Sequence, residues 1–242
     1  MRVALISDLH GSEVALSAVL ASIDRRGVDQ VVCLGDVATL GPRPGFVLDT
    51  LRARGCPTIL GNHDEFLWNP GLVRSYTEAP VIVEAVDWCR DQLSPADLDF
   101  VRSFQPTLTL PLDGVNQLFL FHGSPASHLT DLLATTPPDE LDRHLAGCNA
   151  AVMAGGHTHI QMLRQHRGAL LVNPGSVGLA FREYVAGKAP TLMPHAEYAI
   201  VESAGGAVSV TLQRVPLDKG ALRKAAADSD NPLRGMLIQQ YS

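Results

Sequence analysis

The first hundred residues alternate short runs of β-branched and aliphatic residues with stretches of helical spacing. This alternation is typical of right-handed βαβ units, so it predicts a parallel sheet covered by helices. The spacing predicts helices near 14–23 and 46–54, with Gly27 and Gly55 as their terminators. The expected strands of this half are 2–7, 31–34 and 58–60.

The pattern changes along the second half of the chain. An irregular aromatic stretch at 65–80 precedes two expected helices, and the second opens at Ser94-Pro95-Ala96-Asp97, where Ser is a good N-cap. From Thr107 onward strand patterns dominate, and Asp113-Gly114 is a strong hairpin turn. The tail from Leu217 has a helical pattern and is expected to pack weakly. The expected later elements are strands 107–111, 117–121, 151–154 and 169–172, a helix opening at 136–140, and a hairpin over 198–202 and 207–214.

Length and charge limit what the chain can be. Its 242 residues, 46% of them hydrophobic, suffice for one sizeable core, so we expect a single domain over 1–242, with a core at 3–178 and a tail at 179–242. The formal net charge of -6 argues against binding to long nucleic acid, whose partners are usually basic. A small anionic substrate remains compatible, because local charge in a cleft outweighs the net charge of the surface.

Weaker features of the sequence bear on where the protein resides and whether it forms oligomers. Apolar runs stay well below the ~20 residues of a membrane-spanning helix, so no membrane partner is expected. The four cysteines are scattered and fit a reduced, cytoplasmic protein. An exposed hairpin edge near 207–214 could pair two copies into a homo-oligomer.

Five short polar clusters carry the functional information, because each follows an expected strand and contains or adjoins glycine. In open α/β sheets ligands bind outside the carboxyl ends of the strands, so the clusters are expected to converge. Glycine at these places lets the backbone turn sharply and approach closely. The clusters are Asp8-Leu9-His10-Gly11, Gly35-Asp36, Gly61-Asn62-His63-Asp64, His122-Gly123 and Gly155-Gly156-His157-Thr158-His159.

The side chains in these clusters suit a metal site. Imidazole and oxygen ligands without thiolate favour Mn, Fe, Ni or Zn over Ca or Mg. Seven such side chains are too many for one metal that also binds a substrate, and they fit two metals ~3.5–4 Å apart that share a carboxylate. The i,i+2 pairs Asp8/His10 and His157/His159 are expected to point one way along extended segments. Asp64 is expected to cap the following turn rather than to orient His63.

In order and residue type, the clusters resemble the signature of the calcineurin-like metallophosphoesterase superfamily, over residues 3 to about 178. The resemblance implies a four-layer α-β-β-α sandwich of two mixed sheets flanked by helices. It also implies that His63 is not a ligand but a general acid near the leaving group. The implied ligands are Asp8, His10, Asp36 and His159 for one metal, and Asp36, Asn62, His122 and His157 for the other.

The branch of the superfamily bears on the substrate. An arginine that protein phosphatases and symmetric dinucleoside tetraphosphate hydrolases carry after Gly-Asp is missing from Gly35–Gly41. The chain instead resembles the small bacterial and archaeal phosphodiesterase-like branch at Gly61-Asn62-His63-Asp64, His122-Gly123-Ser124-Pro125 and Asn173–Gly178. This implies a metal-dependent enzyme, with Mn as the favoured metal, that acts on small phosphodiesters or nucleotide-type esters. Asymmetric cleavage of dinucleoside polyphosphates and phosphomonoester hydrolysis are the alternatives.

Two further hypotheses concern the substrate. Arg43 and Arg182 are candidates to bind phosphate oxygens beyond the scissile one, the alternative being solvated surface arginines. Phe66, Trp68 and Tyr76 are candidates to stack on a nucleobase, the alternative being a small core under the loop. A rival of another class is a non-catalytic scaffold, as in a retromer subunit of this fold whose metal site is degraded. The intact set of ligand positions here argues against it.

Overall fold

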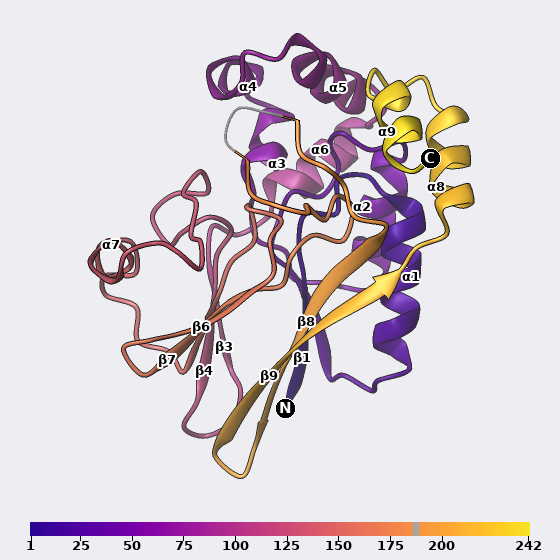
Figure 1. Cartoon of the computed structure of the whole chain (residues 1–242). Helices are drawn as coiled ribbons and strands as arrows, with labels where there is room; N and C mark the ends of the chain where they lie inside the picture. The colour runs from indigo at the N-terminus through magenta and orange to yellow at the C-terminus, as the bar shows by residue number, and fades with distance from the viewer. Residues whose placement is uncertain (186–188) are drawn as a thin grey trace.

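The structure, a computed structural model, describes residues 1–185 and 189–242, in which two β-sheets pack face to face (Figure 1). Helices lie against both outer faces, so the predicted four-layer sandwich of two mixed sheets is confirmed. The first sheet has the strand order β2 (Gln30–Cys33), β1 (Arg2–Ile6), β8 (His195–Ala204), β9 (Ala207–Pro216). The second sheet has the order β3 (Leu108–Pro111), β4 (Gln117–Leu120), β5 (Val152–Ala154), β7 (Ala169–Asn173), β6 (Met162–His166).

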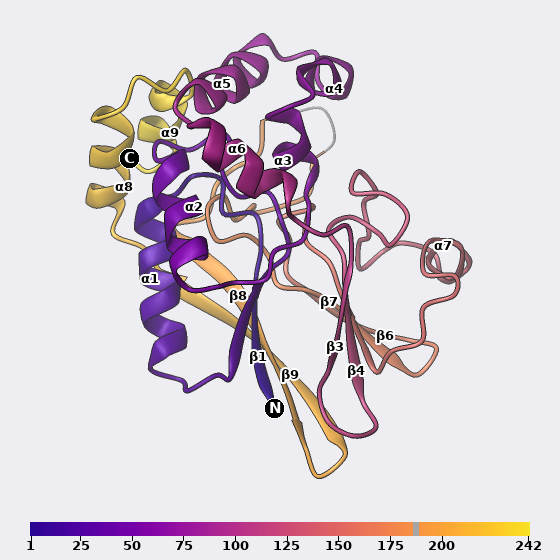
Figure 2. The same cartoon turned by 180° about the vertical axis from the view of Figure 1, so that it is seen from behind.

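The helices divide unequally between the two outer faces. Most lie on the side of the first sheet, whereas α7 lies on the far side of the second (Figure 2). Ser94 caps α6 with a hydroxyl that accepts from the Asp97 amide, as the sequence predicts. The helices are α1 (Glu13–Asp24), α2 (Pro44–Ala53), α3 (Asn62–Phe66), α4 (Pro70–Tyr76), α5 (Pro80–Asp91), α6 (Pro95–Arg102), α7 (Pro138–His144), α8 (Lys219–Ala227) and α9 (Arg234–Gln240).

Alternation along the strands builds the layers. In β1, Val3 and Leu5 face the second sheet, whereas Ala4 and Ile6 face the helices. All four are fully buried, which explains why this strand reads as a continuous apolar run. β4 and β5 alternate in the same way between the inter-sheet core and α7.

The parallel pairs decide where the site lies. β1 pairs in parallel with β2, and β5 pairs in parallel with both β4 and β7. The carboxyl ends of β1 and β2 in one sheet and of β4 and β5 in the other therefore deliver the loops that follow them to one region. The remaining neighbours, β8, β9, β3 and β6, pair antiparallel and complete the two sheets.

Several sequence expectations were wrong in detail. Residues 58–60 form only isolated bridges rather than a strand, and the stretch 65–80, expected to be irregular, contains the end of α3 and all of α4. β6 was not predicted, whereas the tail from Leu217 is helical as expected and forms α8 and α9. The tail packs well rather than weakly, because α8 and α9 bury a set of apolar side chains in a common cluster: Leu222, Ala226, Leu233, Leu237 and Tyr241.

No helix in the two described segments combines the length and the apolar character needed to cross a membrane.

Candidate metal centre

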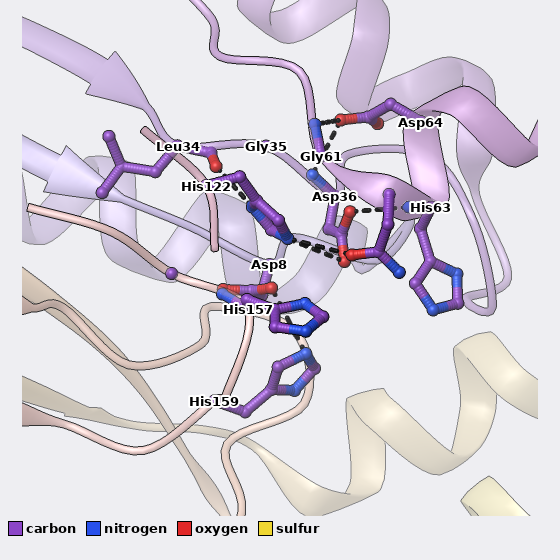
Figure 3. Close-up of polar contacts among 12 residues, drawn as sticks. Asp8, Leu34, Gly35, Asp36, Gly61, His63, Asp64, His122, His157 and His159 are labelled. Carbon is purple, nitrogen blue, oxygen red and sulfur yellow. Dashed lines mark hydrogen bonds and ion pairs between the residues drawn. The ribbon is translucent and has the colours of Figure 1, made fainter. Parts of the chain in front are cut away.

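The five polar clusters meet beside the carboxyl ends of β1 and β2 in one sheet and of β4 and β5 in the other, as the sequence predicts (Figure 3). Two groups of ligand atoms form there, and within each group the atoms lie within 4.8 Å of one another. Both groups contain the Asp36 carboxylate. The first group is Asp8, His10, Asp36 and His159, and the second is Asp36, His122 and His157. Asn62 adjoins the second group, with its Oδ1 at 3.2 Å from His122 Nε2.

Asp36 lies at the centre of the arrangement. Its Oδ2 is 3.9 Å from His10 Nε2 and 3.4 Å from His122 Nε2, so one oxygen faces both groups. Its other oxygen, Oδ1, accepts a hydrogen bond of 2.9 Å from the amide of His63. That bond fixes the carboxylate against the start of α3.

Backbone carbonyls orient two of the imidazoles. His122 Nδ1 lies 2.6 Å from the Leu34 carbonyl, and His159 Nδ1 lies 2.7 Å from the Leu179 carbonyl. A carbonyl oxygen can only accept, so each Nδ1 carries a proton. Each Nε2 then turns inward, and in the neutral ring it offers a lone pair, the usual arrangement behind metal-binding histidines. His10 Nε2 also faces His159 Nε2 at 3.1 Å.

Unusual backbone conformations aim these side chains. Asp8, His10, Asp36, His157 and His159 all have positive φ, between 44° and 69°. The expectation of extended i,i+2 pairs was therefore wrong, because both members of each pair adopt the left-handed conformation. Non-glycine residues rarely adopt it, and it persists where surrounding contacts enforce it, often at functional sites.

Two glycines allow these segments to approach. A Cβ on Gly61 would lie 2.1 Å from Asp36 Oδ1, and a Cβ on Gly156 would lie 2.7 Å from Asp8 Oδ2. Only hydrogen fits at either position. The glycines beside the polar clusters are thus needed for close approach, as their placement in the sequence indicated.

Asp64 supports the site from behind. Its carboxylate accepts hydrogen bonds from the amides of Asp36 (2.8 Å), Val37 (2.8 Å) and Gly61 (2.9 Å). The bond to Gly61 caps α3, which confirms the expected capping role. The other two bonds extend that role, because they tie the loop after β2 to the start of α3.

The electrostatics of the site favour a bound cation. Burial opposes ionisation of Asp36, yet the nearby His122, His63 and His10 hold its pKa well below its usual range. Burial likewise opposes charge on His122, but Asp36 and Asp8 raise its pKa to about 10. Burial and the neighbouring His122 lower the pKa of His157 to about 4. The buried carboxylates thus attract positive charge, while His157 stays neutral and able to coordinate.

Unsatisfied polar atoms also fit a metal. Within the described residues, the buried Asp8 Oδ1 and Asn62 Nδ2 make no hydrogen bond. His159 Nε2 lies 3.3 Å from Asp8 Oδ1. A buried carboxylate oxygen without a donor is expensive unless a cation compensates it. Nitrogen and oxygen donors of this kind suit borderline divalent ions.

His63 lies beside the cluster and outside both ligand groups. Thr39 Oγ1 is 3.0 Å from His63 Nδ1 and 3.4 Å from His10 Nδ1. The Phe66 ring contacts His63 edge-on at a centroid distance of 4.9 Å. Burial lowers the pKa of His63. Thr39 could not be identified from the sequence, since a threonine three residues after Asp36 has no special pattern.

The aromatic-stacking hypothesis is wrong for Phe66, and the packing of the partly buried Trp68 favours the alternative of a structural role. Phe66 is 1% exposed and belongs to a hydrophobic cluster, and Trp68 packs against the main core. Their rings therefore stabilise the fold. Tyr76 alone is exposed, at 46%, and its ring lies 6.2 Å from that of His63.

The two candidate arginines are exposed residues on the surface. Arg43 Nε is 3.6 Å from Glu13, and Arg182 Nε is 3.3 Å from Glu183. Across residues 1–185 and 189–242, neither forms an ion pair with the buried carboxylates. Arg182 directly follows Phe181, whose ring stacks on His159 at 4.2 Å.

The C-terminal tail reaches this region as well. Asn231 is buried, and its Nδ2 donates to the carbonyls of Leu40 and Gly41 at 3.0 Å each. These carbonyls belong to the loop that carries Asp36 and Thr39. The segment between α8 and α9 therefore supports one wall of the site.

Comparisons with known proteins agree with this geometry. A protein of Methanocaldococcus jannaschii known only as uncharacterized is 25% identical over 177 residues, covering 73% of this chain and 70% of the relative. The crystal structure of a metallophosphoesterase from Sphaerobacter thermophilus superposes with a TM-score of 0.75 at 24% identity, covering 100% of this chain and 98% of that one. A hypothetical protein from Pyrococcus horikoshii OT3 gives a TM-score of 0.79 at 18% identity, covering 98% and 96%.

The match to a family model covers most of the chain. Residues 1–193 match the calcineurin-like phosphoesterase superfamily domain, a family of phosphoester hydrolases. The matched region contains all five polar clusters, the whole second sheet, and β1 and β2 of the first sheet. It ends just before β8. The expected resemblance is thereby confirmed, and the chain belongs to the calcineurin-like phosphoesterase superfamily.

Proposed function

We propose that this chain is a two-metal phosphoesterase that hydrolyses small phosphodiesters or nucleotide-type phosphate esters. The observation that carries the proposal is the sharing of Asp36 by two groups of ligand atoms, each spanning less than 4.8 Å. A shared carboxylate is the usual bridge of two-metal hydrolytic sites. Membership of a phosphoesterase superfamily gives the reaction class.

In this proposal Asp8, His10, Asp36 and His159 hold one metal, and a second set holds the other. When bound, the two cations supply a water-derived nucleophile near neutral pH and stabilise charge on the phosphoryl oxygens. Mn suits this mixture of nitrogen and oxygen donors, as do Fe, Ni and Zn. The second set is Asp36, Asn62, His122 and His157.

The remaining roles belong to side chains around the ligands. His63 is proposed to give a proton to the leaving oxygen, and Thr39 orients its ring through the contact at Nδ1. Arg182 and Arg43 are proposed to bind phosphate oxygens beyond the scissile one. Both side chains are more than half exposed, and each now pairs with a surface glutamate that a phosphate would replace.

The location and assembly of the protein remain predictions. A reduced, cytoplasmic setting fits four free cysteines, three of which are buried. A homo-oligomer could form through β9, which lies at the edge of the first sheet.

The test begins with protein stripped by a chelator. Metal content is measured after Mn is restored, and hydrolysis of bis-p-nitrophenyl phosphate is compared with that of p-nitrophenyl phosphate. We expect two metal ions per chain and turnover of the diester only with metal. A chain that binds two metals and cleaves neither ester would instead support the scaffold alternative. Failure to bind metal contradicts the proposal outright.

A further inference from the structure

A carboxylate outside the seven ligand positions lies at the entrance to the site. Asp131, in the loop between β4 and α7, places Oδ1 3.5 Å from His157 Nε2. Its Oδ2 accepts a hydrogen bond of 2.5 Å from the Tyr184 hydroxyl. The side chain of Asp131 is 41% exposed, whereas that of His157 is 5% exposed. Asp131 thus marks the boundary between solvent and the buried ligands.

Contacts on both sides fix this carboxylate. His157 approaches it from the loop after β5, and Tyr184 approaches it from the segment after β7. Asp131 also influences Tyr76. Burial raises the pKa of the Tyr76 hydroxyl, and the charges of Asp36 and Asp131 raise it further. A second carboxylate, Glu65, lies in the same region, where it pairs with His128 at 3.3 Å. Burial lowers the pKa of His128, against the opposing charge of Glu65, and His122 of the site lowers it further.

Charge is what separates the two simplest classes of phosphate ester. A phosphodiester carries one negative charge. A monoester has a second pKa of about 6 and therefore carries almost two negative charges at neutral pH. Both present the same phosphorus to the site. A fixed carboxylate beside His157 therefore repels the bound monoester more strongly than the bound diester.

We propose that Asp131 is a specificity-determining residue that disfavours phosphate dianions and so directs the site toward phosphodiesters. The inference rests on the proposed function, because it assumes that the phosphoryl group binds next to His157. Tyr184 is a positioning residue in this scheme, since its hydroxyl holds the carboxylate toward the site.

The test uses Asp131→Asn, which removes the charge and retains an oxygen that can accept from Tyr184. Binding of methyl phosphate and of dimethyl phosphate to the Mn-loaded protein is measured by calorimetry near pH 8, where the first is a dianion and the second a monoanion. We expect methyl phosphate to gain about fivefold more affinity than dimethyl phosphate, the factor for one unit charge about 4 Å away in water. The ratio of kcat/KM for monoester over diester should rise by a similar factor.

Two further variants calibrate the result. Asp139→Asn removes an exposed charge from α7, where Asp139 pairs only with Arg143 among the described residues, and it should leave both affinities unchanged. Tyr184→Phe keeps the charge and removes its hydrogen bond, so it should shift the preference in the same direction by about twofold or less. High salt should reduce the difference between wild type and Asp131→Asn.

Three outcomes overturn the inference. Equal changes in affinity for the two ligands would mean that Asp131 does not distinguish them by their charge. Loss of a metal ion from Asp131→Asn would make Asp131 a metal ligand instead. Absence of methyl phosphate binding to every variant would remove the assumed subsite. If Asp131→Asn shows the expected change in binding but the wild type hydrolyses neither ester, the proposed function fails and only the selection of bound ligands by charge stands.

Discussion

The buried and exposed parts of the site are held in different ways. The floor comprises the seven ligand positions Asp8, His10, Asp36, Asn62, His122, His157 and His159. The rim comprises Tyr76, Asp131, Arg182 and Tyr184. Floor side chains are almost fully buried, and five of the seven have positive φ. Rim side chains are 41% to 64% exposed, and in the described segments their polar contacts are to other exposed or half-exposed groups, apart from that of Asp131 with His157.

This difference separates the residues that would carry out the reaction from those that would select the substrate. Strand ends, glycine contacts and backbone hydrogen bonds position the floor, so changing it disturbs the fold as well as the chemistry. Apart from Tyr76 at the end of α4, the rim side chains lie on loops, and such positions tolerate substitution because little packing depends on them. The rim can therefore alter the choice of substrate while the floor keeps the same reaction.

The largest expected effect comes from the centre of the floor. Asp36→Asn keeps the shape of the side chain but removes the charge that both ligand groups share. We expect bound metal to fall from two ions to at most one, and kcat to fall about a thousandfold, equivalent to ~4 kcal/mol of lost transition-state stabilisation. Elemental analysis and steady-state kinetics measure the two effects. Asp49→Asn, on the exposed face of α2, is the matched control. A variant with two metals and near-normal kcat would show that Asp36 is not the bridge.

Gly61→Ala tests whether close approach holds the floor together. The new Cβ would lie 2.1 Å from Asp36 Oδ1, so we expect the free energy of unfolding to fall by about 2–3 kcal/mol in metal-free protein. Urea denaturation measures the change. Gly45→Ala, where nothing lies within 4 Å, is the control and should gain up to ~1 kcal/mol because alanine restricts the unfolded chain. Equal stability of the two variants would contradict this view of the floor.

Thr39→Val sharpens the role of His63. Valine preserves the buried volume and removes the hydroxyl 3.0 Å from His63 Nδ1, so kcat should fall about tenfold while metal content is retained. The loss should be greater for a diester with an alkoxide leaving group, which needs a proton, than for one that releases p-nitrophenolate. An equal loss for both leaving groups would assign Thr39 a purely structural role.

The smallest effect is expected at the two exposed arginines. Arg182→Ala and Arg43→Ala should each raise KM for a dinucleoside polyphosphate about threefold, because an exposed cation contributes little in water. Arg102→Ala, on the exposed surface of α6, should leave KM unchanged. If KM stays constant in the first two variants, these arginines do not bind phosphate. Stability should change by less than about 0.5 kcal/mol in all three.

Sequence reasoning succeeded where local pattern and topology agree. Polar residues beside glycine after a parallel strand can point to only one region, so the convergence of Asp8, Asp36 and His122 could be predicted. Hairpins and the Ser94 cap depend on a few adjacent residues, and they too could be predicted.

The rest depends on contacts between distant segments. The left-handed conformations of Asp8 and His157 arise from tertiary packing, which the i,i+2 spacing does not encode. The Asp131–Tyr184 pair joins residues 53 positions apart, from two loops without a motif. β6 was missed because its exposed face carries Leu163 among polar residues, which obscures the expected alternation.

The hydrogen bonds of Asn231 have a practical consequence for shortening the chain. The match to the superfamily ends at residue 193, which would suggest a minimal fragment without β8, β9 and the last two helices. Such a fragment would leave the carbonyls of Leu40 and Gly41 without their amide donor and would uncover the apolar side chains beneath α8 and α9. The boundary of sequence similarity is therefore not a boundary for protein engineering, and a fusion partner would need a linker that leaves this tail docked.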